Sequence, residues 1–459
     1  MVTPSGSSYY LSGHMAPVPD EIDFPGLEVT GALPPELSGR YLRNGPNPRP
    51  GEDPGHWFMG HGMIHGIRIR DGRAEWYRNR WVRTAQLEGK QAFRGDGTFD
   101  RTVGSANTHV MSHAGRIYAL VESAFPYELT PELETVGPCD FGGRLTTGMT
   151  AHPKEHPASG DLHFFGYGFL PPYLTYHRLS AAGVLECSVE IPVRAATMNH
   201  DFAITEHHAL FLDQPMTFQL DLLATGMPFG WDDGYGTRIG VMPLDRPGEV
   251  TWFDVDPCFV FHVGNAHEDA AGRIVLEAPR HGPADAIAMW ASVAGPRADG
   301  RPGADATGLA QLHRWTLDPA TGAVTEERID DRGVEFPTLD DRLVGRASRY
   351  LYAVSGRAGA PSPAEARNGA AIVKYDETSG SVTAHALAPD TAAGEAVFVP
   401  AQGGTAEDDG WLLTITTRLD SSASQLLVLD AGDVAGPPVA TVTLPRGVPA
   451  GFHGSWIAD

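Results

Sequence analysis

The sequence predicts an all-β fold, and three observations support this class. Short segments rich in Val, Ile, Thr, Tyr, Phe and Trp recur along the whole chain, separated by many of its 54 glycines and 37 prolines. This is the pattern of strands joined by turns. Helical periodicity is weak throughout. Regular short strands indicate a sandwich, a barrel or a propeller, and the length of 459 residues favours a propeller, whose blades repeat every ~40–50 residues.

The expected strands follow one another as hairpins, each consisting of two apolar runs around a polar or glycine-bearing turn. The hairpins are expected at residues 110–129 (turn 114–115), 162–193 (turn 180–183), 309–329 (turn 318–322) and 370–387 (turn 376–380), with two or three further strands at 410–444. Helix candidates are short, at 131–136 and 285–293, and residues 294–308 and 356–368 resemble exposed loops. No linker-like segment of low complexity interrupts the pattern, so we predict one domain over residues 1–459.

The composition excludes several classes of partner. The formal net charge of −23 repels phosphate backbones, which argues against nucleic acid and against a polybasic grip on anionic lipid. Three scattered cysteines, Cys139, Cys187 and Cys258, are too few for a disulfide framework and fit a reducing compartment. There is no apolar run of ~18 residues and no leader-like start. We therefore expect a cytoplasmic protein without a transmembrane segment, with at most peripheral contact with a membrane.

Four of the 19 histidines stand at the ends of strand-like segments beside turn residues: His152 in MTAHP, His200 in MNHDFAIT, His262 in CFVFH and His453 in GFHGSW. Their separations of 48, 62 and 191 residues would place them on different blades. Inner strand ends of a propeller converge on its axis, so such histidines can meet at one point. Spacing alone leaves the set open, because five other histidines have similar settings: His156, His163, His207, His208 and His267.

Four imidazoles define a particular kind of metal site. Neutral nitrogen ligands suit iron, copper, zinc or nickel, whereas structural zinc more often uses cysteine and catalytic zinc usually has three protein ligands. On a six-coordinate iron, four imidazoles leave two positions for dioxygen chemistry. Each ligand also needs an acceptor for its second nitrogen. Glu122, Glu335 and Glu395 lie in apolar strand-like segments and could serve, although an outward-facing strand position is the ordinary interpretation of each.

Segments along nearly the whole chain resemble the carotenoid cleavage oxygenase family, in the family's order. Any one segment is a weak signal, but together they are specific. They are YLRNGPNP (41–48), HWFMGHGMIHG (56–66), WYRNRWVRT (76–84), ANTHV (106–110), YALVESAFPYEL (118–129), MTAHP (149–153), MNHDFAIT (198–205), FHVGNAHE (261–268), EFPTLDDRLVG (335–345), EDDGWLL (407–413) and GFHGSW (451–456).

The resemblance implies a seven-bladed β-propeller with a dome of helices and loops over the active-site face. It implies Fe(II) on the propeller axis and oxidative cleavage of a carbon–carbon double bond to two carbonyl products. By motif match, the ligand positions fall on His152, His200, His262 and His453. The carboxylates that steady three of these histidines fall on Glu122, Glu335 and Glu395. The implied partners are dioxygen and an apolar conjugated alkene.

The family pattern also bears on the substrate. Where stilbene-cleaving members have a lysine directly before the first glutamate, this chain has Val121, which favours a carotenoid or apocarotenoid over a phenolic stilbene. Phe58 is a candidate to line the cavity or to pack within the dome. The segment 218–241 is short and partly polar, whereas some relatives carry a longer apolar insertion there for membrane docking. This favours a shorter apocarotenoid, or a stilbene.

Two positions depart from the family pattern, and other functions remain open. His61 replaces an acid in GHGM, where an ordinary loop histidine is favoured over a metal ligand, and His267 stands where an aromatic residue is common. A propeller that binds a polyene without cleaving it would have a damaged ligand set. A lactonase-type propeller would use calcium, and EDDG (407–410) is better explained as a solvated turn. A retinoid-type isomerase would share the four histidines.

Overall fold

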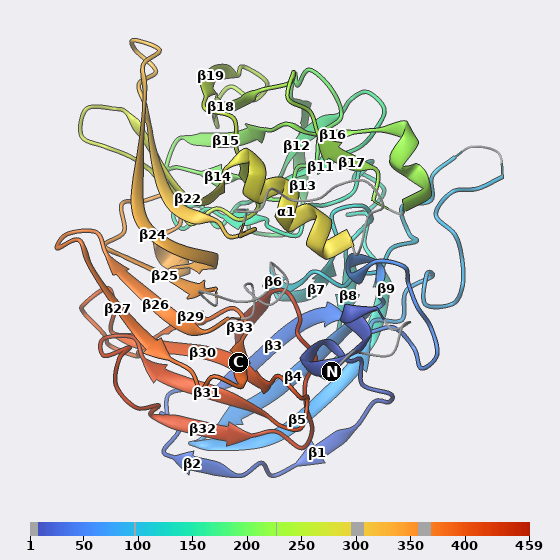
Figure 1. The fold of residues 1–459 in the computed structure, drawn as a ribbon, viewed down its shortest axis with the longest axis vertical. Helices are drawn as coiled ribbons and strands as arrows, with labels where there is room; N and C mark the ends of the chain where they lie inside the picture. Colours follow the sequence, from blue (N-terminus) through green and yellow to red (C-terminus); the bar gives the residue numbers. More distant parts are fainter. Residues whose placement is uncertain (1–7, 96–97, 226, 295–306, 357–368) are drawn as a thin grey trace.

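The computed structural model describes residues 8–95, 98–225, 227–294, 307–356 and 369–459. Over these residues the protein is mostly β: it has 33 strands, one α-helix and five short 3-10 helices. Figure 1 shows the sheets side by side around the middle of the molecule. The all-β class is therefore confirmed. The predicted loops at 294–308 and 356–368 lie almost entirely outside the described residues.

The strands form antiparallel sheets, most of them built from consecutive segments of the chain. Three sheets have four strands: β6 (His109–His113), β7 (Arg116–Leu120), β8 (Tyr127–Leu129) and β9 (Thr135–Pro138); β10 (Lys154–Glu155), β11 (Leu162–Tyr167), β12 (Leu174–Leu179) and β13 (Leu185–Glu190); and β14 (Ala203–Ile204), β15 (His208–Asp213), β18 (Thr237–Pro243) and β19 (Thr251–Val255). A separate hairpin joins β16 (Met216–Phe218) to β17 (Phe229–Trp231).

A long strand, β24 (Val324–Thr338), belongs to two groups of strands. Its first part, up to residue 333, pairs with β23 and its last part, from residue 334, with β25, and each pairing contains a register shift. The resulting sheet contains β20 (Phe259–Val260), β21 (Asn265–Glu268), β22 (Ile274–His281), β23 (Gln311–Leu317), β24, β25 (Tyr350–Ser355), β26 (Ala371–Asp376) and β27 (Ser381–Ala386).

Two sheets combine segments from both ends of the chain. One contains β1 (Asp23–Pro25), β5 (Arg73–Trp81), β4 (Gly62–Arg70), β3 (Gly39–Pro46) and β33 (Gly454–Ala458). The other contains β2 (Val29–Gly31), β32 (Ala440–Thr443), β31 (Ser424–Asp430), β30 (Gly410–Arg418), β28 (Thr391–Ala393) and β29 (Val397–Pro400). Because β33 pairs with β3 and β2 pairs with β32, backbone hydrogen bonds join the start of the described chain to its end.

In several sheets the strand at one edge is more exposed than the inner strands, and the sequence reflects this difference. β11 and β12 are almost wholly buried and rich in apolar and aromatic residues, although they also contain buried histidines, while β13 alternates between buried or half-buried and exposed residues. The same change runs from β25 and β26 to β27. Strands with both faces covered need apolar residues at every position, and strands with one solvated face need them only at alternate positions. The hairpins expected from the sequence are all confirmed.

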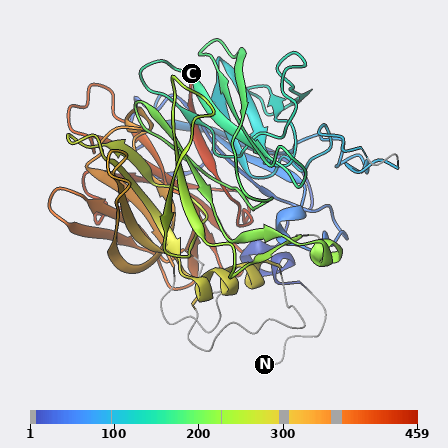
Figure 2. The same ribbon diagram turned by 90° about the horizontal axis from the view of Figure 1, so that it is seen from above.

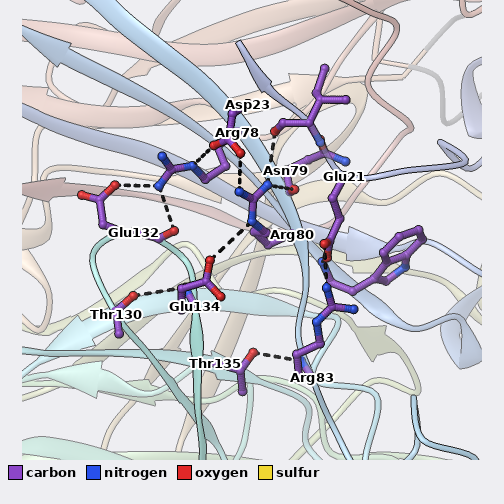
Figure 3. A network of polar contacts seen from close by, with 12 residues as sticks. Glu21, Asp23, Arg78, Asn79, Arg80, Arg83, Thr130, Glu132, Glu134 and Thr135 are labelled. Atoms are coloured by element: carbon purple, nitrogen blue, oxygen red, sulfur yellow. Dashed lines mark hydrogen bonds and ion pairs between the residues drawn. The ribbon is translucent and has the colours of Figure 1, made fainter. Parts of the chain in front are cut away.

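A network of ion pairs ties the N-terminal segment to the neighbouring sheets (Figure 3). Asp23 in β1 accepts hydrogen bonds from Arg78 and Arg80 of β5. Arg78 also binds Glu132, in the turn between β8 and β9, with its Nη1 atom 2.6 Å from Oε2. The network thus joins two sheets across their edges. Most of its carboxylates are exposed, so each pair contributes little by itself, typically ~0–1 kcal/mol.

The helices gather on one side of the sheets (Figure 2). The helices on this side are η1 (Tyr9–Leu11), η2 (Gly13–Met15), η3 (Trp57–Met59), η4 (Leu220–Thr225) and α1 (Pro283–Ala294). A further short helix, η5 (Asp341–Leu343), follows β24 and is not part of this group. α1 confirms the helix expected at 285–293 and starts with proline, whose fixed φ suits a first helical position. Within the described ranges, no helix combines the length and hydropathy needed to cross a membrane.

The helix expected at 131–136 is wrong. Residues 131–132 form a turn, Leu133 has a φ of 67°, and residues from Thr135 onward form β9. The Thr130 hydroxyl accepts the backbone N–H of Glu134 and stabilises this turn. Left-handed backbone at Leu133 is incompatible with a helix, and the strand partners of β9 decide the conformation of the remaining residues.

Candidate metal centre

Strand ends from four different sheets deliver the four predicted histidines to one place. His152 precedes β10, His200 precedes β14, His262 follows β20 and His453 precedes β33. All four side chains are buried. One nitrogen from each ring lies within 4.8 Å of the others, so the group could hold a metal ion.

The distances between the rings fit shared coordination. The Nε2 atoms of His152 and His200 are 2.9 Å apart, and those of His262 and His453 are 3.1 Å apart. Two nitrogens bonded at ~2.1 Å to one metal, at a right angle, would be about 3.0 Å apart. The Nε2 atoms, rather than the Nδ1 atoms, therefore face the common centre.

Three glutamates each bind the Nδ1 atom of one histidine, on the side of the ring that faces away from the common centre. The Nδ1 atom of His200 lies 2.9 Å from Glu122, that of His262 lies 2.7 Å from Glu335, and that of His453 lies 2.9 Å from Glu395. A carboxylate accepts hydrogen bonds, so each Nδ1 carries the proton and donates it. Each Nε2 then keeps a lone pair directed at the centre, which is the tautomer that a metal ligand requires.

His152 is held by a different arrangement, because no carboxylate pairs with its ring among the described residues. The Thr150 hydroxyl accepts the backbone N–H of His152 at 3.2 Å and donates to the backbone carbonyl of His200 at 2.9 Å. Thr150 is fully buried. It therefore links the backbones of two of the four histidines.

Asp201 links three of the segments that carry the histidines. It follows His200 directly, and its Oδ2 atom accepts the backbone N–H of Val263, next to His262, at 2.7 Å. Its Oδ1 atom pairs with Lys154, two residues after His152, at 2.9 Å. The carboxylate is almost fully buried. One oxygen of this buried carboxylate binds a cation and the other binds a backbone N–H. These two bonds fix the segments of His152, His200 and His262 relative to one another.

Burial favours the neutral form of two of the four imidazoles. Burial, reinforced by the neighbouring histidines, holds the pKa of His152 and of His262 well below the ordinary range. Burial likewise lowers the pKa of the adjacent His109 to about 4, and this ring stacks at 6.1 Å from that of His152. Burial also raises the pKa of Glu335 to about 7. Neutral imidazoles with free lone pairs are the form that binds a metal cation.

Phe336 packs directly on the centre from a strained backbone. Its φ is 53°, a conformation that costs a bulky residue of the order of 1–3 kcal/mol. The ring stacks on His262 with centroids 5.2 Å apart, and the backbone N–H donates to Glu335. The strained backbone thus places the Phe336 ring against His262 and the Phe336 N–H against Glu335, the carboxylate that holds His262.

A cavity of about 1100 Å³ opens onto the histidine centre, and three of the four histidines line it: His200, His262 and His453. Its walls are largely aromatic and aliphatic. Residues that line it include Trp57, Phe58, Val121, Tyr167, Met198, Phe261, Met289, Phe336 and Phe452. Its size slightly exceeds the ~300–1,000 Å³ of ordinary small-molecule sites, so it can take an extended apolar molecule.

Both predicted substrate-lining residues lie in the cavity wall. Phe58 lies in η3, where His56 accepts its backbone N–H and Asn107 donates to its carbonyl at 2.8 Å. Its ring also packs against Phe452 at 5.4 Å, so lining and packing occur together. Val121 directly precedes Glu122 and lines the same cavity.

The other candidate histidines have partners elsewhere. His156 binds the carbonyl of Glu206, His163 binds the Tyr176 hydroxyl, and His208 pairs with Glu268. His61 pairs with Glu52 at 3.1 Å, as expected of a loop histidine. His207 and His267 are outside the four-histidine group as well.

The acids of the EDDG turn are all used internally. Glu407 accepts backbone N–H groups from Arg349 and Tyr350, Asp408 pairs with Lys374, and Asp409 caps its own loop. Glu407 and Asp408 thus attach the connection between β29 and β30 to β25 and β26, while Asp409 stabilises the connection itself, which agrees with a turn.

Sequence reasoning missed the polar residues that connect the ligand segments. Thr150, Lys154 and Asp201 lie within two residues of His152 or His200. Thr150 and Asp201 stand inside motifs that the resemblance had already singled out, and Lys154 directly follows one of them. Adjacency to a ligand was the available signal. Their partners are distant in sequence, however, and only the fold identifies them.

Fold and site define a class: a mostly-β protein with four buried imidazoles at an apolar cavity. The family described as retinal pigment epithelial membrane protein matches residues 15–458. The carotenoid cleavage oxygenase of Mycobacterium tuberculosis is 39% identical over 97% of this chain and 97% of its own. The chain therefore belongs to the carotenoid cleavage oxygenase family, and it is an oxygenase.

Solved structures agree with this placement. The crystal structure of Pseudomonas brassicacearum lignostilbene dioxygenase is similar with a TM-score of 0.86 and 28% identity, over 100% of both chains. Cobalt-substituted apocarotenoid oxygenase from Synechocystis is similar with a TM-score of 0.80 and 30% identity, over 96% of this chain and 97% of its own.

Proposed function

We propose that this protein is a non-haem Fe(II) dioxygenase that cleaves a carbon–carbon double bond of a carotenoid or apocarotenoid into two carbonyl products. One observation carries the proposal: four buried imidazoles direct Nε2 atoms to one point at the wall of a large apolar cavity. The similarity to the Mycobacterium tuberculosis carotenoid cleavage oxygenase supports it.

Iron fits the donor set. Four neutral nitrogens leave the full charge on a divalent ion and suit iron among the transition metals, and the three carboxylates behind them balance that charge nearby. His152, His200, His262 and His453 would hold the ion. When bound, iron supplies the dioxygen chemistry, and the protein supplies orientation and a dry site.

The protein's own residues hold and orient the alkene. Phe58, Phe261 and Phe452 present rings to the cavity near the histidines, and stacking against such faces aligns a flat conjugated chain. Apolar walls exclude water and protect reactive species from side reactions. The glutamates keep three imidazoles in one orientation while the substrate enters and leaves.

The fold that accompanies this function is a single-domain, seven-bladed propeller over residues 1–459, with a dome of helices and loops. The strand pairings support it. When the large sheet is divided at β24 and the β16–β17 hairpin is set apart, seven groups of strands remain. Pairing of β33 with β3 and of β2 with β32 joins the first group to the last.

A cytoplasmic location with peripheral contact to a membrane surface would give the protein access to an apolar substrate. Phe93, Leu170 and Leu223 line the cavity and are 60%, 77% and 50% exposed. They form an apolar rim where the cavity meets solvent. The three cysteines are free, in keeping with a reducing compartment.

A stilbene or related phenolic alkene is the second candidate substrate. Similarity to the lignostilbene dioxygenase of Pseudomonas brassicacearum over the whole chain favours it. Val121 opposes it, because an uncharged branched side chain in the cavity wall gives a phenolate no partner.

Aerobic incubation of the iron-loaded protein with β-apocarotenals and with resveratrol-like stilbenes tests the proposal by product mass. We expect one iron per chain and aldehyde pairs from the apocarotenals. His262→Ala should lose iron and turnover, while His61→Ala, a histidine outside the cluster, should keep both. Products from stilbenes alone would replace the carotenoid substrate, and a His262→Ala protein that retains iron and turnover would refute the metal site.

A further inference from the structure

A buried arginine, Arg43, lies in the cavity wall beside the histidine centre. It belongs to β3, is 2% exposed and lines the cavity. Two glycines that lie beside Arg43 adjoin the metal-ligand segments in the sequence. Gly451 stands two residues before His453, and Gly394 directly precedes Glu395, the glutamate that holds His453.

The guanidinium has few partners for its five N–H groups. Nη2 donates to the backbone carbonyl of Pro449, and Nε has no hydrogen-bond partner in the described part of the chain. Across the same residues, no carboxylate forms an ion pair with Arg43. An arginine stays protonated in proteins, and burying a cation without an anion is costly. The site therefore lacks an acceptor.

The space next to the guanidinium is kept free by small residues. Ala393, Gly394, Ala450 and Gly451 line the cavity around it. A Cβ at Gly451 would lie only 2.9 Å from Arg43 Nε, whereas one at Gly394 would lie 3.7 Å from Nη1. Nε is enclosed beneath Gly451, whereas the missing side chain at Gly394 leaves room beside Nη1, on the side of the guanidinium that can meet a ligand in the otherwise apolar cavity.

We propose that Arg43 binds a carboxylate or a carbonyl at one end of the substrate, and so selects such polyenes over those that end in a hydroxyl or a hydrocarbon group. The polyene part of this inference rests on the proposed function. A planar guanidinium donates short, charge-assisted hydrogen bonds to such oxygens. In an apolar cavity one such bond favours the oxygenated ligand by roughly 10- to 100-fold in affinity.

Binding to the metal-free protein tests the proposal without any turnover. All-trans-retinoic acid and all-trans-retinol share one polyene and differ at the end group, and their dissociation constants can be measured by quenching of tryptophan fluorescence, since Trp57 lines the cavity. At pH 8 we expect the acid to bind on the order of 10–100 times more tightly than the alcohol. Equal affinities would overturn the proposal.

Three variants localise the preference. Arg43→Met should bring the two affinities together, and Arg43→Lys should keep part of the difference. Arg101→Met is the matched control, because Arg101 also lines the cavity but donates to the Thr146 carbonyl and packs over Phe99. This control should keep the full preference. A preference that survives Arg43→Met, or is lost in Arg101→Met instead, contradicts the assignment.

A milder change covers the case in which Arg43→Met fails to fold. A Cβ at Gly394 meets only ordinary contacts, so the Gly394→Ala protein should fold. The added methyl group should crowd the guanidinium and lower the affinity for the acid more than the affinity for the alcohol. An unchanged ratio would count against the proposal. If the protein prefers the acid but cleaves no polyene, the proposed function is wrong and this inference stands. If it cleaves polyenes but binds the acid and the alcohol equally, this inference is wrong and the proposed function stands.

Discussion

Asp201 shows how one side chain can organise a metal centre without touching the metal. Its carboxylate binds Lys154 and the N–H of Val263, and it follows His200 in the chain. His152 has no carboxylate of its own among the residues described, so its position depends on these backbone links and on Thr150. Asp201 thus holds the segment of His152 through Lys154, without contacting the His152 ring.

Replacing Asp201 by alanine should weaken metal binding by roughly 10- to 100-fold, the usual effect of losing a residue that supports ligands. Titration with Co(II), followed through its visible absorption, measures both the affinity and the ligand geometry. Asp213→Ala is a matched control, because Asp213 is also fully buried and ion-paired, with Arg238, away from the centre. Equal cobalt affinity in the two variants would show that Asp201 has only a structural role.

At the residue scale, sequence reasoning selected the histidines and glutamates that the structure brings together, but it could not pair them. Which glutamate serves which histidine depends on sequence separations of 58 to 78 residues. Phe336 illustrates what remained hidden. Its left-handed backbone and its stacking on His262 follow from the fold around it, because nothing local in EFPT predicts a positive φ for phenylalanine.

At the scale of elements, β33 depends on an ion pair at its end. Asp459 binds Arg68 of β4, whose side chain is 2% exposed, and the same carboxylate accepts from Ser38 and Arg40. The hydrogen bond from Arg68 holds the pKa of Asp459 well below its usual range. The ion pair therefore connects β33 to β4 across β3, beyond the backbone pairing.

Asp459→Asn should lower the free energy of unfolding at pH 7 by about 1–2 kcal/mol, a value reduced because the carboxylate is partly exposed. Since the folded-state pKa is depressed, this stability is fully present above the unfolded pKa of ~3.9. It is lost as the pH falls below that value. Urea denaturation at several pH values measures it. The exposed Asp254→Asn should show no such difference, and a difference that persists undiminished at the lowest pH would contradict the assignment.

The wrong helix at 131–136 illustrates the limit of prediction at this scale. The segment contains helix-compatible residues, yet the turn at Leu133 and the pairing of β9 with β8 determine its conformation. Strands such as β11, by contrast, were predictable because most of their buried positions hold apolar or aromatic residues.

At the scale of the whole molecule, the metal centre joins sheets that are distant in sequence. The ligands stand next to β10, β14, β20 and β33, in four different sheets. The overall class was predictable because regular hairpins and length restrict the architecture. The cavity was not, since residues from 9 to 453 line it and no local pattern shows which of them meet.

Iron loading should raise the melting temperature of the protein, because a ligand that binds only the native state stabilises it, by about 2.7 kcal/mol at a concentration 100 times its Kd. Scanning calorimetry of metal-free and iron-loaded protein, under argon, measures the shift. His262→Ala should show no shift. Identical melting temperatures for both forms of the native protein would mean that iron does not bridge the four sheets.

The pairing of β33 with β3 has a consequence for biosynthesis. A nascent chain still attached to the ribosome exposes the edge of β3 until residues 454–458 have emerged, and an unpaired edge is a template for association with other chains. The fourth imidazole, at His453, arrives with the same segment. Complete metal capture and protection of that edge thus occur together, after the segments that carry the other three histidines have been synthesised.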